Sequence, residues 1–67
     1  MKNFIRFNRE KADLNQTEFA KRCKVSRQTI HAIETGTFNP SVILALKMAR
    51  ELKIPLQELF KLEAKDE

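Results

Sequence analysis

The chain has 67 residues, of which 42% are hydrophobic and 33% are charged, and its formal net charge is +4 at pH 7. This length allows a single small domain, residues 1–67, whose core needs close helix packing or self-association to be stable. The apolar runs are too short to cross a bilayer and no apolar segment follows Met1, so neither a membrane span nor a signal peptide is expected.

Helical periodicity dominates the chain and predicts an all-α fold with five helices. The first helix is expected at residues 2–12, with Ile5 facing inward. The second is expected at about residues 16–23, after a capping box in which Asn15 caps the helix and Glu18 reaches back to it.

A third helix is expected over residues 27–35. Ser26 is a favourable N-cap for it, and Gly36, the only glycine of the chain, stands where a helix end favours a positive φ. Lys24 and Val25 are expected to form the tight turn between the second and third helices. This arrangement is a helix-turn-helix pattern.

The last two helices are expected to begin at prolines. Pro40 is expected to mark the start of the fourth helix, because proline suits a first helical turn. Pro55 is expected to open a short fifth helix that runs through Phe60, before a charged and frayed tail at residues 61–67. The apolar face of the fourth helix is predicted to consist of Val42, Ala45, Met48, Ala49 and Leu52.

The third helix carries the side chains that indicate a function. Ile30 and Ile33 are predicted to face inward, so that Arg27 and Gln28 are exposed in the first turn. An arginine can donate two hydrogen bonds to guanine O6 and N7, and a glutamine can pair with adenine N6 and N7. Such side chains at the start of an exposed helix are suited to reading base edges in a DNA major groove.

Several neighbouring side chains allow two interpretations each. Ala32 can contact a thymine methyl group or merely favour the helix, and His31 faces either solvent or the edge of the groove. The Ser26 hydroxyl caps the helix and can also meet a phosphate or a base edge. A phosphate contact and a local capping role suit Thr29 equally well. The threonines on either side of the glycine are candidate phosphate donors, namely Thr35 and Thr37.

Other function classes find little support in the sequence. A single cysteine and a single histidine exclude an internal disulfide and a metal site built from the two, and Cys23 is expected to be a buried structural thiol. No nucleophile–base pair, paired carboxylates or phosphate-binding glycine loop is recognisable, so we expect no catalytic residue, no metal, no cofactor and no enzyme. A basic domain also suits an anionic membrane surface, but the apolar helix faces are needed inside the fold.

Six segments in register carry a resemblance to a known family: LNQTEFA, VSRQTI, AIETG, FNPS, LALKMARELKI and PLQELF. Over about residues 5–60 the chain resembles the Cro/phage-repressor-type (XRE-like) helix-turn-helix regulators, and among them small standalone members similar to the cytolysin repressor. The resemblance implies a compact five-helix DNA-binding domain with its helix-turn-helix at about residues 16–35. In similar regulators the chain ends also pair as a short β-ribbon, which here sets residues 1–3 against 60–62.

The resemblance also implies roles for individual residues. Relatives bring the side chain corresponding to Gln16, together with its helix N-terminus, onto a DNA phosphate. They pair the arginine corresponding to Arg9 with the glutamate corresponding to Glu34, which orients the guanidinium toward DNA. Asn8 departs from the family, which usually has leucine or isoleucine there, so it needs a polar partner or a shifted docking of the first helix.

The resemblance implies a homodimer that binds double-stranded DNA at a two-fold operator and regulates transcription as a repressor, and we expect a cytoplasmic protein. An antitoxin, or a phage Cro- or immunity-type switch protein with an additional protein partner, is the alternative. No small-molecule ligand is evident. The candidates for the dimer surface are Ile43, Leu56, Leu59 and Phe60, and Ile43 is unusually apolar for an exposed position.

Overall fold

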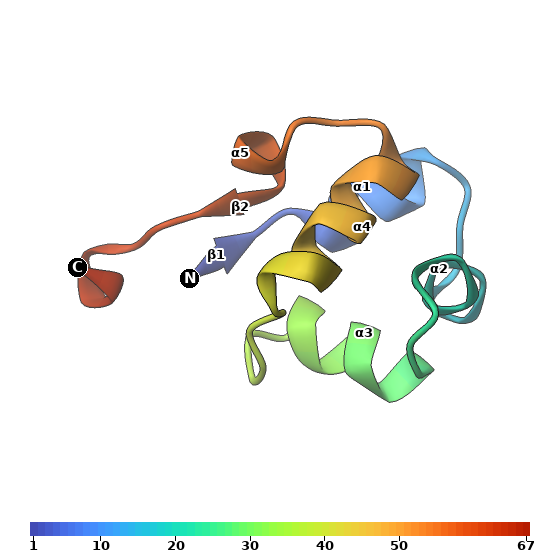
Figure 1. The fold of residues 1–67 in the computed structure, drawn as a ribbon, viewed down its shortest axis with the longest axis horizontal. Helices are drawn as coiled ribbons and strands as arrows, with labels where there is room; N and C mark the ends of the chain where they lie inside the picture. The colour runs from blue at the N-terminus through green and yellow to red at the C-terminus, as the bar shows by residue number, and fades with distance from the viewer.

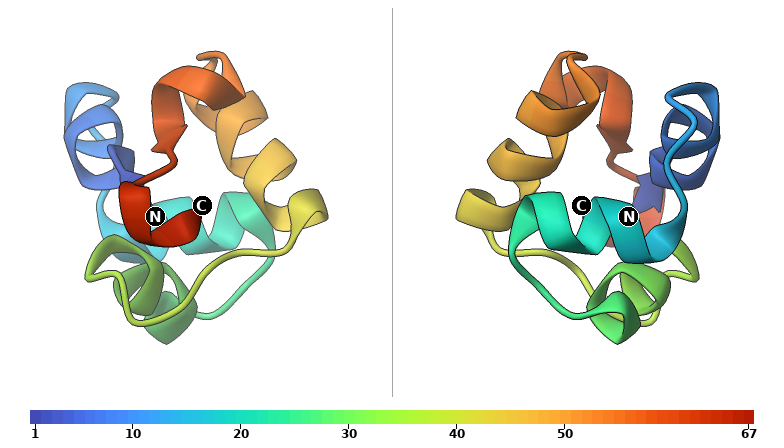
Figure 2. Two further views of the ribbon diagram at one scale, coloured as in Figure 1. Left: turned by 90° about the vertical axis from the view of Figure 1, so that its left-hand side faces the viewer. Right: turned by 90° about the vertical axis from the view of Figure 1, so that its right-hand side faces the viewer.

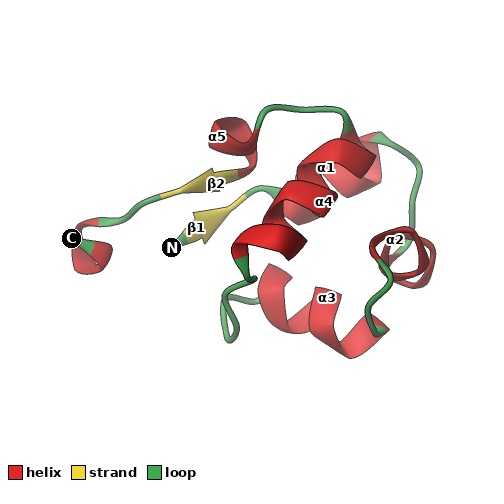
Figure 3. Cartoon of the chain, viewed as in Figure 1, coloured by secondary structure: helices red, strands yellow, loops and turns green.

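Eight short elements follow one another in the computed structural model, which describes residues 1–67 (Figure 1). The prediction of an all-α fold with five helices is confirmed, and a small two-stranded sheet accompanies the helices (Figure 3). None of the helices has the length and apolar character that a bilayer crossing requires. In chain order the elements are β1 (Lys2–Asn3), α1 (Ile5–Lys11), α2 (Gln16–Cys23), α3 (Arg27–Glu34), α4 (Val42–Leu52), α5 (Leu56–Leu59), β2 (Phe60–Lys61) and the 3₁₀ helix η1 (Ala64–Asp66).

The ends of the chain pair with each other. Strands β1 and β2 are antiparallel, with Lys2 opposite Lys61 and Asn3 opposite Phe60, which confirms the terminal ribbon. The prediction that the first helix begins at residue 2 is therefore wrong, because the ribbon holds the first residues extended and α1 begins at Ile5. The Asn3 side chain joins ribbon and helices, since its Nδ2 donates to the Ile33 carbonyl at 2.9 Å and its Oδ1 accepts from the Ile5 amide at 3.2 Å.

Local capping defines α2 as predicted. The amide of Glu18 donates to Asn15 Oδ1 at 2.8 Å, and the Glu18 carboxylate accepts from the Asn15 amide at 3.1 Å, which completes the capping box.

The two ends of α3 also match the prediction. At its start the Thr29 amide donates to Ser26 Oγ at 3.1 Å. At its end Gly36 has a φ of +83°, its amide donates to the Ile33 carbonyl and the Thr37 amide donates to the Ala32 carbonyl. These two bonds form a Schellman motif, in which a residue with positive φ lets the chain leave the helix.

The later part of the chain corrects three predictions. Helix α4 is capped by Ser41, whose Oγ accepts from the Leu44 amide at 3.1 Å, so Pro40 precedes the cap and does not lie in the first turn. Val42, which was predicted to face the core, is 73% exposed, and Leu44 is buried in its place. The tail, which was predicted to be frayed, contains η1. The Met1 ammonium lies 3.0 Å from Asp66 Oδ2 of that helix, so an ion pair ties the tail to the start of the chain.

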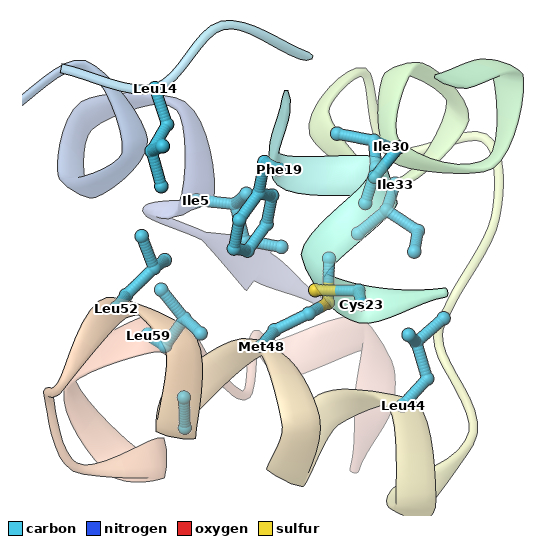
Figure 4. Close-up of a cluster of buried hydrophobic side chains, with 12 residues drawn as sticks. Ile5, Leu14, Phe19, Cys23, Ile30, Ile33, Leu44, Met48, Leu52 and Leu59 are labelled. Carbon is cyan, nitrogen blue, oxygen red and sulfur yellow. The ribbon is translucent and has the colours of Figure 1, made fainter. Parts of the chain in front are cut away.

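The core lies among all five helices (Figure 4). Helix α2 packs against both α3 and α4, while α3 and α5 lie at opposite ends of the molecule (Figure 2). Cys23 is fully buried, and burial raises the pKa of its thiol to about 11, which confirms the expected structural thiol. The core cluster consists of Ile5, Leu14, Phe19, Ala20, Cys23, Ile30, Ile33, Leu44, Met48, Ala49, Leu52 and Leu59.

Candidate nucleic-acid interface

Helix α3 has one buried face and one open face. Ile30 and Ile33 are 0% and 1% exposed and anchor the helix in the core, whereas Arg27, Gln28 and His31 are exposed. The predicted division of this helix into inward and outward residues is therefore confirmed. The first turn presents a guanidinium and an amide to solvent, side chains that can hydrogen-bond base edges.

The turn between α2 and α3 determines how the first turn of α3 is exposed. Lys24 adopts a left-handed conformation with φ of +59°, and the Val25 amide donates to the Ala20 carbonyl at 3.0 Å. Val25 packs against the core, so the chain reverses tightly and α3 begins directly afterwards. This geometry confirms the predicted helix-turn-helix.

A nearly buried ion pair joins α1 to α3. Arg9 Nε donates to Glu34 Oε2 at 2.7 Å and Arg9 Nη2 donates to Oε1 at 3.1 Å, with side chains only 9% and 4% exposed. The hydrogen bond to Glu34 raises the pKa of Arg9, so the guanidinium is always charged. Its Nη1 also donates to the Leu14 carbonyl at 2.9 Å. The predicted pair is present, and three N–H groups of Arg9 are used within the chain.

Gln16, at the first position of α2, reaches the same pair. Its Nε2 lies 3.1 Å from Glu34 Oε1 and 3.3 Å from His31 Nδ1. The backbone N–H groups of Gln16 and Thr17 make no hydrogen bond within the chain, as expected at a helix start. Around these side chains lies a polar depression of about 320 Å³, lined by Arg6, Arg9, Glu10, Gln16, Arg27, His31, Glu34 and Thr35.

The hydroxyl groups of the interface form hydrogen bonds at the two ends of α3. Ser26 Oγ and Thr29 Oγ1 lie 2.9 Å apart beside the N-cap bond. Thr35 and Thr37 both donate to the Ala32 carbonyl, at 3.2 and 3.1 Å. Their hydroxyl protons are thus engaged within the chain, a capping role that the sequence did not predict but that the neighbouring glycine could have indicated.

Asn8, which stands where the family usually has leucine or isoleucine, hydrogen-bonds within its own segment. Its Nδ2 donates to the Phe4 carbonyl at 2.8 Å, and the side chain is half-buried. Because that bond stays within the same segment, Asn8 needs no polar partner from another helix, and α1 docks through Ile5 and Arg9.

A second surface, on α4, is apolar. Ile43 is 69% exposed as predicted, and Val42 and Leu46, which the sequence did not place in this surface, are 73% and 53% exposed. We refer to these three residues as the α4 surface. Leu56 and Phe60 are half-buried and line an adjoining apolar depression of about 190 Å³ together with Met1, Pro40, Val42 and Ala45.

Leu59 corrects the predicted dimer surface. It is 0% exposed, because α5 packs it into the core, so it offers no area to a second copy.

Comparisons with known proteins agree with this geometry. The chain matches the helix-turn-helix family over residues 5–59. It is 42% identical over 60 residues to an uncharacterized HTH-type transcriptional regulator of Methanocaldococcus jannaschii, covering 90% of this chain and 91% of that protein. It is 48% identical over 52 residues to another from Methanothermobacter thermautotrophicus, covering 78% and 75%. The crystal structure of the restriction-modification controller protein C.AhdI from Aeromonas hydrophila matches with a TM-score of 0.78 at 32% identity, covering 84% and 85% of the two chains.

Proposed function

The chain belongs to the XRE-like helix-turn-helix family of DNA-binding transcriptional regulators, and we propose that it is a sequence-specific repressor that binds a two-fold operator as a homodimer. The observation that carries the proposal is the two-sided α3. Two buried isoleucines hold the helix rigidly, and its exposed first turn carries Arg27 and Gln28. In this proposal α3 enters the major groove with its N-terminus toward the base edges.

The base-reading residues follow from this orientation. Arg27 pairs with a guanine and Gln28 with an adenine, because each offers the matching pattern of donors and acceptors. One turn further along the helix, Ala32 contacts a thymine methyl group and His31 faces the groove. Ser26 reaches a base edge or a phosphate from the N-cap.

Phosphate contacts flank the recognition helix and position it. The free N–H groups at the start of α2, at Gln16, suit an anion because they lie at the positive end of the helix dipole. Arg9 keeps two of its five N–H groups free for a second phosphate. Thr29, Thr35 and Thr37 are further candidates, and the last two have to release the Ala32 carbonyl to donate.

The apolar α4 surface supports the homodimer. One recognition helix contacts only a few base pairs, which is too little to select a site among many competitors. Two helices about 34 Å apart, one turn of B-DNA, double the number of contacts and require a two-fold site. Ile43, Leu56 and Phe60 lie on or beside the α4 surface, whose exposed apolar area is typical of association sites.

Two expectations from the sequence remain proposals. We take the chain to act by binding and without catalysis. A switch protein with an additional partner is the second candidate, and the exposed ring of Phe7 favours it. Phe7 is 60% exposed in a groove apart from the α4 surface, with the Lys11 ammonium 5.4 Å from its ring centroid. The other residues that line this groove are Phe4, Asn8, Ile54, Glu58 and Lys61.

Selection of binding sites from random duplexes tests the proposed function. We expect a motif of two inverted half-sites whose centres lie about 10 base pairs apart. Affinity for the selected duplex should fall steeply with potassium concentration, because the proposed phosphate contacts release condensed counterions from the DNA. A motif without symmetry contradicts the dimer on a two-fold site, and an affinity that does not respond to salt contradicts DNA binding through this surface.

A further inference from the structure

Four polar side chains from three helices form a continuous series. Arg9 of α1 contacts Glu34 of α3, Glu34 contacts Gln16 of α2, and Gln16 contacts His31 of α3. The first two members are nearly buried and the last is exposed in the polar depression described above. The series therefore leads from the interior to the surface that faces DNA in the proposed function.

Glu34 determines the orientation of the Gln16 amide. Both Glu34 oxygens accept hydrogen bonds from the Arg9 guanidinium, so the carboxylate is ionised and can only accept. The side-chain atom that Gln16 places 3.1 Å from Glu34 Oε1 must then be its NH₂ group, since an amide oxygen there would face a carboxylate oxygen.

The amide orientation in turn determines the state of the His31 ring. Gln16 Nε2 also lies 3.3 Å from His31 Nδ1, and an amide NH₂ group can only donate. Nδ1 must therefore accept, which requires the neutral ring to carry its proton on Nε2. His31 Nε2 makes no hydrogen bond within the chain, and the side chain is exposed four residues after Arg27, on the same face of α3.

We propose that Gln16 is a positioning residue that holds neutral His31 as the Nε2–H tautomer, so that His31 offers DNA a hydrogen-bond donor and selects an acceptor. The acceptor is a purine N7, guanine O6, thymine O4 or a phosphate oxygen. This inference rests on the proposed function, because it assumes that the exposed face of α3 meets DNA.

The role of Gln16 differs from the one that the family resemblance implies. Both hydrogens of its side-chain amide are engaged, by Glu34 and by His31, and the remaining polar atom is an oxygen that repels a phosphate. A phosphate at the start of α2 is therefore bound by backbone N–H groups, and the side chain acts on DNA through His31.

The tautomer of His31, the only histidine, can be measured in the free protein. In ¹⁵N-labelled protein with a neutral imidazole, long-range ¹H–¹⁵N spectra should show a protonated Nε2 in the wild type. In Gln16→Leu this preference should weaken and the two tautomers should mix. Thr17→Ala, a change at the next exposed position of α2, is the matched control and should leave the spectrum unchanged. A protonated Nδ1 in the wild type, or no response to Gln16→Leu, overturns the proposal.

A double-mutant cycle tests the route from Gln16 to DNA. On the selected operator we expect Gln16→Leu and His31→Ala each to weaken binding by about 3- to 10-fold, the range of one hydrogen bond. In the His31→Ala background, Gln16→Leu should then have almost no further effect, because its contribution passes through the ring. An undiminished effect of Gln16→Leu in that background indicates a direct contact with DNA and overturns the positioning role.

The base dependence of the His31→Ala loss identifies the acceptor. Loss of preference at one base position indicates a base edge, whereas a uniform loss over all sequences indicates a phosphate. Unchanged affinity in His31→Ala overturns the contact with DNA. If the wild type binds no duplex, the proposed function fails, while the spectra of the free protein still decide the tautomer.

Discussion

The polar face around α3 and the apolar α4 surface present two different kinds of surface. On the first, Arg9, Glu34 and Gln16 already satisfy one another within the chain, so the surface is organised before any ligand arrives. On the second, Val42, Ile43 and Leu46 are each more than half exposed and no part of the chain covers them. The first surface suits a rigid polyanion, and the second gains stability only when another apolar surface covers it.

The largest expected effect concerns the organised polar face. Arg9→Met leaves the Glu34 carboxylate buried without a charged partner, and we expect the free energy of unfolding to fall by about 3 kcal/mol. Lys11→Met removes the same charge from an exposed position of the same helix, where the ammonium contacts only the Phe7 ring at 5.4 Å, and should lower the free energy of unfolding by less than about 1 kcal/mol. Urea unfolding measures both. Equal, small losses would show that the ion pair does not hold this face together.

The second effect concerns the α4 surface. Leu46→Glu places a charge in the proposed interface, where a buried leucine contributes about 2 kcal/mol, and two-fold symmetry applies the change twice. We therefore expect the dimer dissociation constant to rise at least about 10-fold in sedimentation equilibrium. Leu62→Glu, at another exposed leucine outside this surface, is the control and should leave dimerisation unchanged. A wild type that stays monomeric at micromolar concentration contradicts the assignment of this surface.

A smaller effect on stability should distinguish the turn after α2, at Lys24, from the turn after α3, at Gly36. Lys24 has a φ of +59°, a conformation that costs a residue with a Cβ more than a glycine, so Lys24→Gly should stabilise the fold by about 0.5–1 kcal/mol. Gly36→Ala should destabilise it by about 1 kcal/mol. At Gly36 an added Cβ meets no atom within 4 Å, so this cost is purely conformational. Thermal unfolding of both variants tests the pair, and shifts of the same sign would contradict this explanation.

A further effect is a pH dependence in the core. Burial raises the pKa of Cys23 to about 11 from its usual value near 9, so above pH 9 the unfolded chain loses this proton while the folded chain keeps it. The stabilising contribution of the thiol is therefore complete below pH 9 and decreases as the pH rises toward 11. We expect the stability difference between wild type and Cys23→Ala to shrink between pH 8 and pH 10 in urea unfolding. A difference that grows over this range would contradict the burial of the thiol.

The parts of the fold that could be predicted from the sequence are those that depend on neighbouring residues. The ends of α2 and α3 depend on bonds between residues three to five positions apart, at Asn15, Ser26 and Gly36, and these were predicted correctly. The start of α1 depends on pairing with residues near position 60, which overrides the local helical pattern. The rotation of α4 that buries Leu44 instead of Val42 likewise depends on packing against distant helices.

For the site, the exposed side chains of α3 could be predicted, because the inward positions of Ile30 and Ile33 determine the outer face. The contact between Gln16 and His31 could not, because it joins two helices whose relative placement the periodicity of neither one specifies. The same holds for Leu59, whose burial depends on how α5 closes the core.

The central claim is that the organised face of α3 reads bases, and Arg27→Ala tests it most directly. Affinities of wild type, Arg27→Ala and the control Lys11→Ala should be measured on the selected operator and on its single-base variants. We expect Arg27→Ala to lose about 1–3 kcal/mol on the operator and to stop distinguishing the base at one position of each half-site. Lys11→Ala, which removes the same charge outside the polar depression beside α3, should keep every preference. An Arg27→Ala protein with the full set of wild-type base preferences would contradict the account.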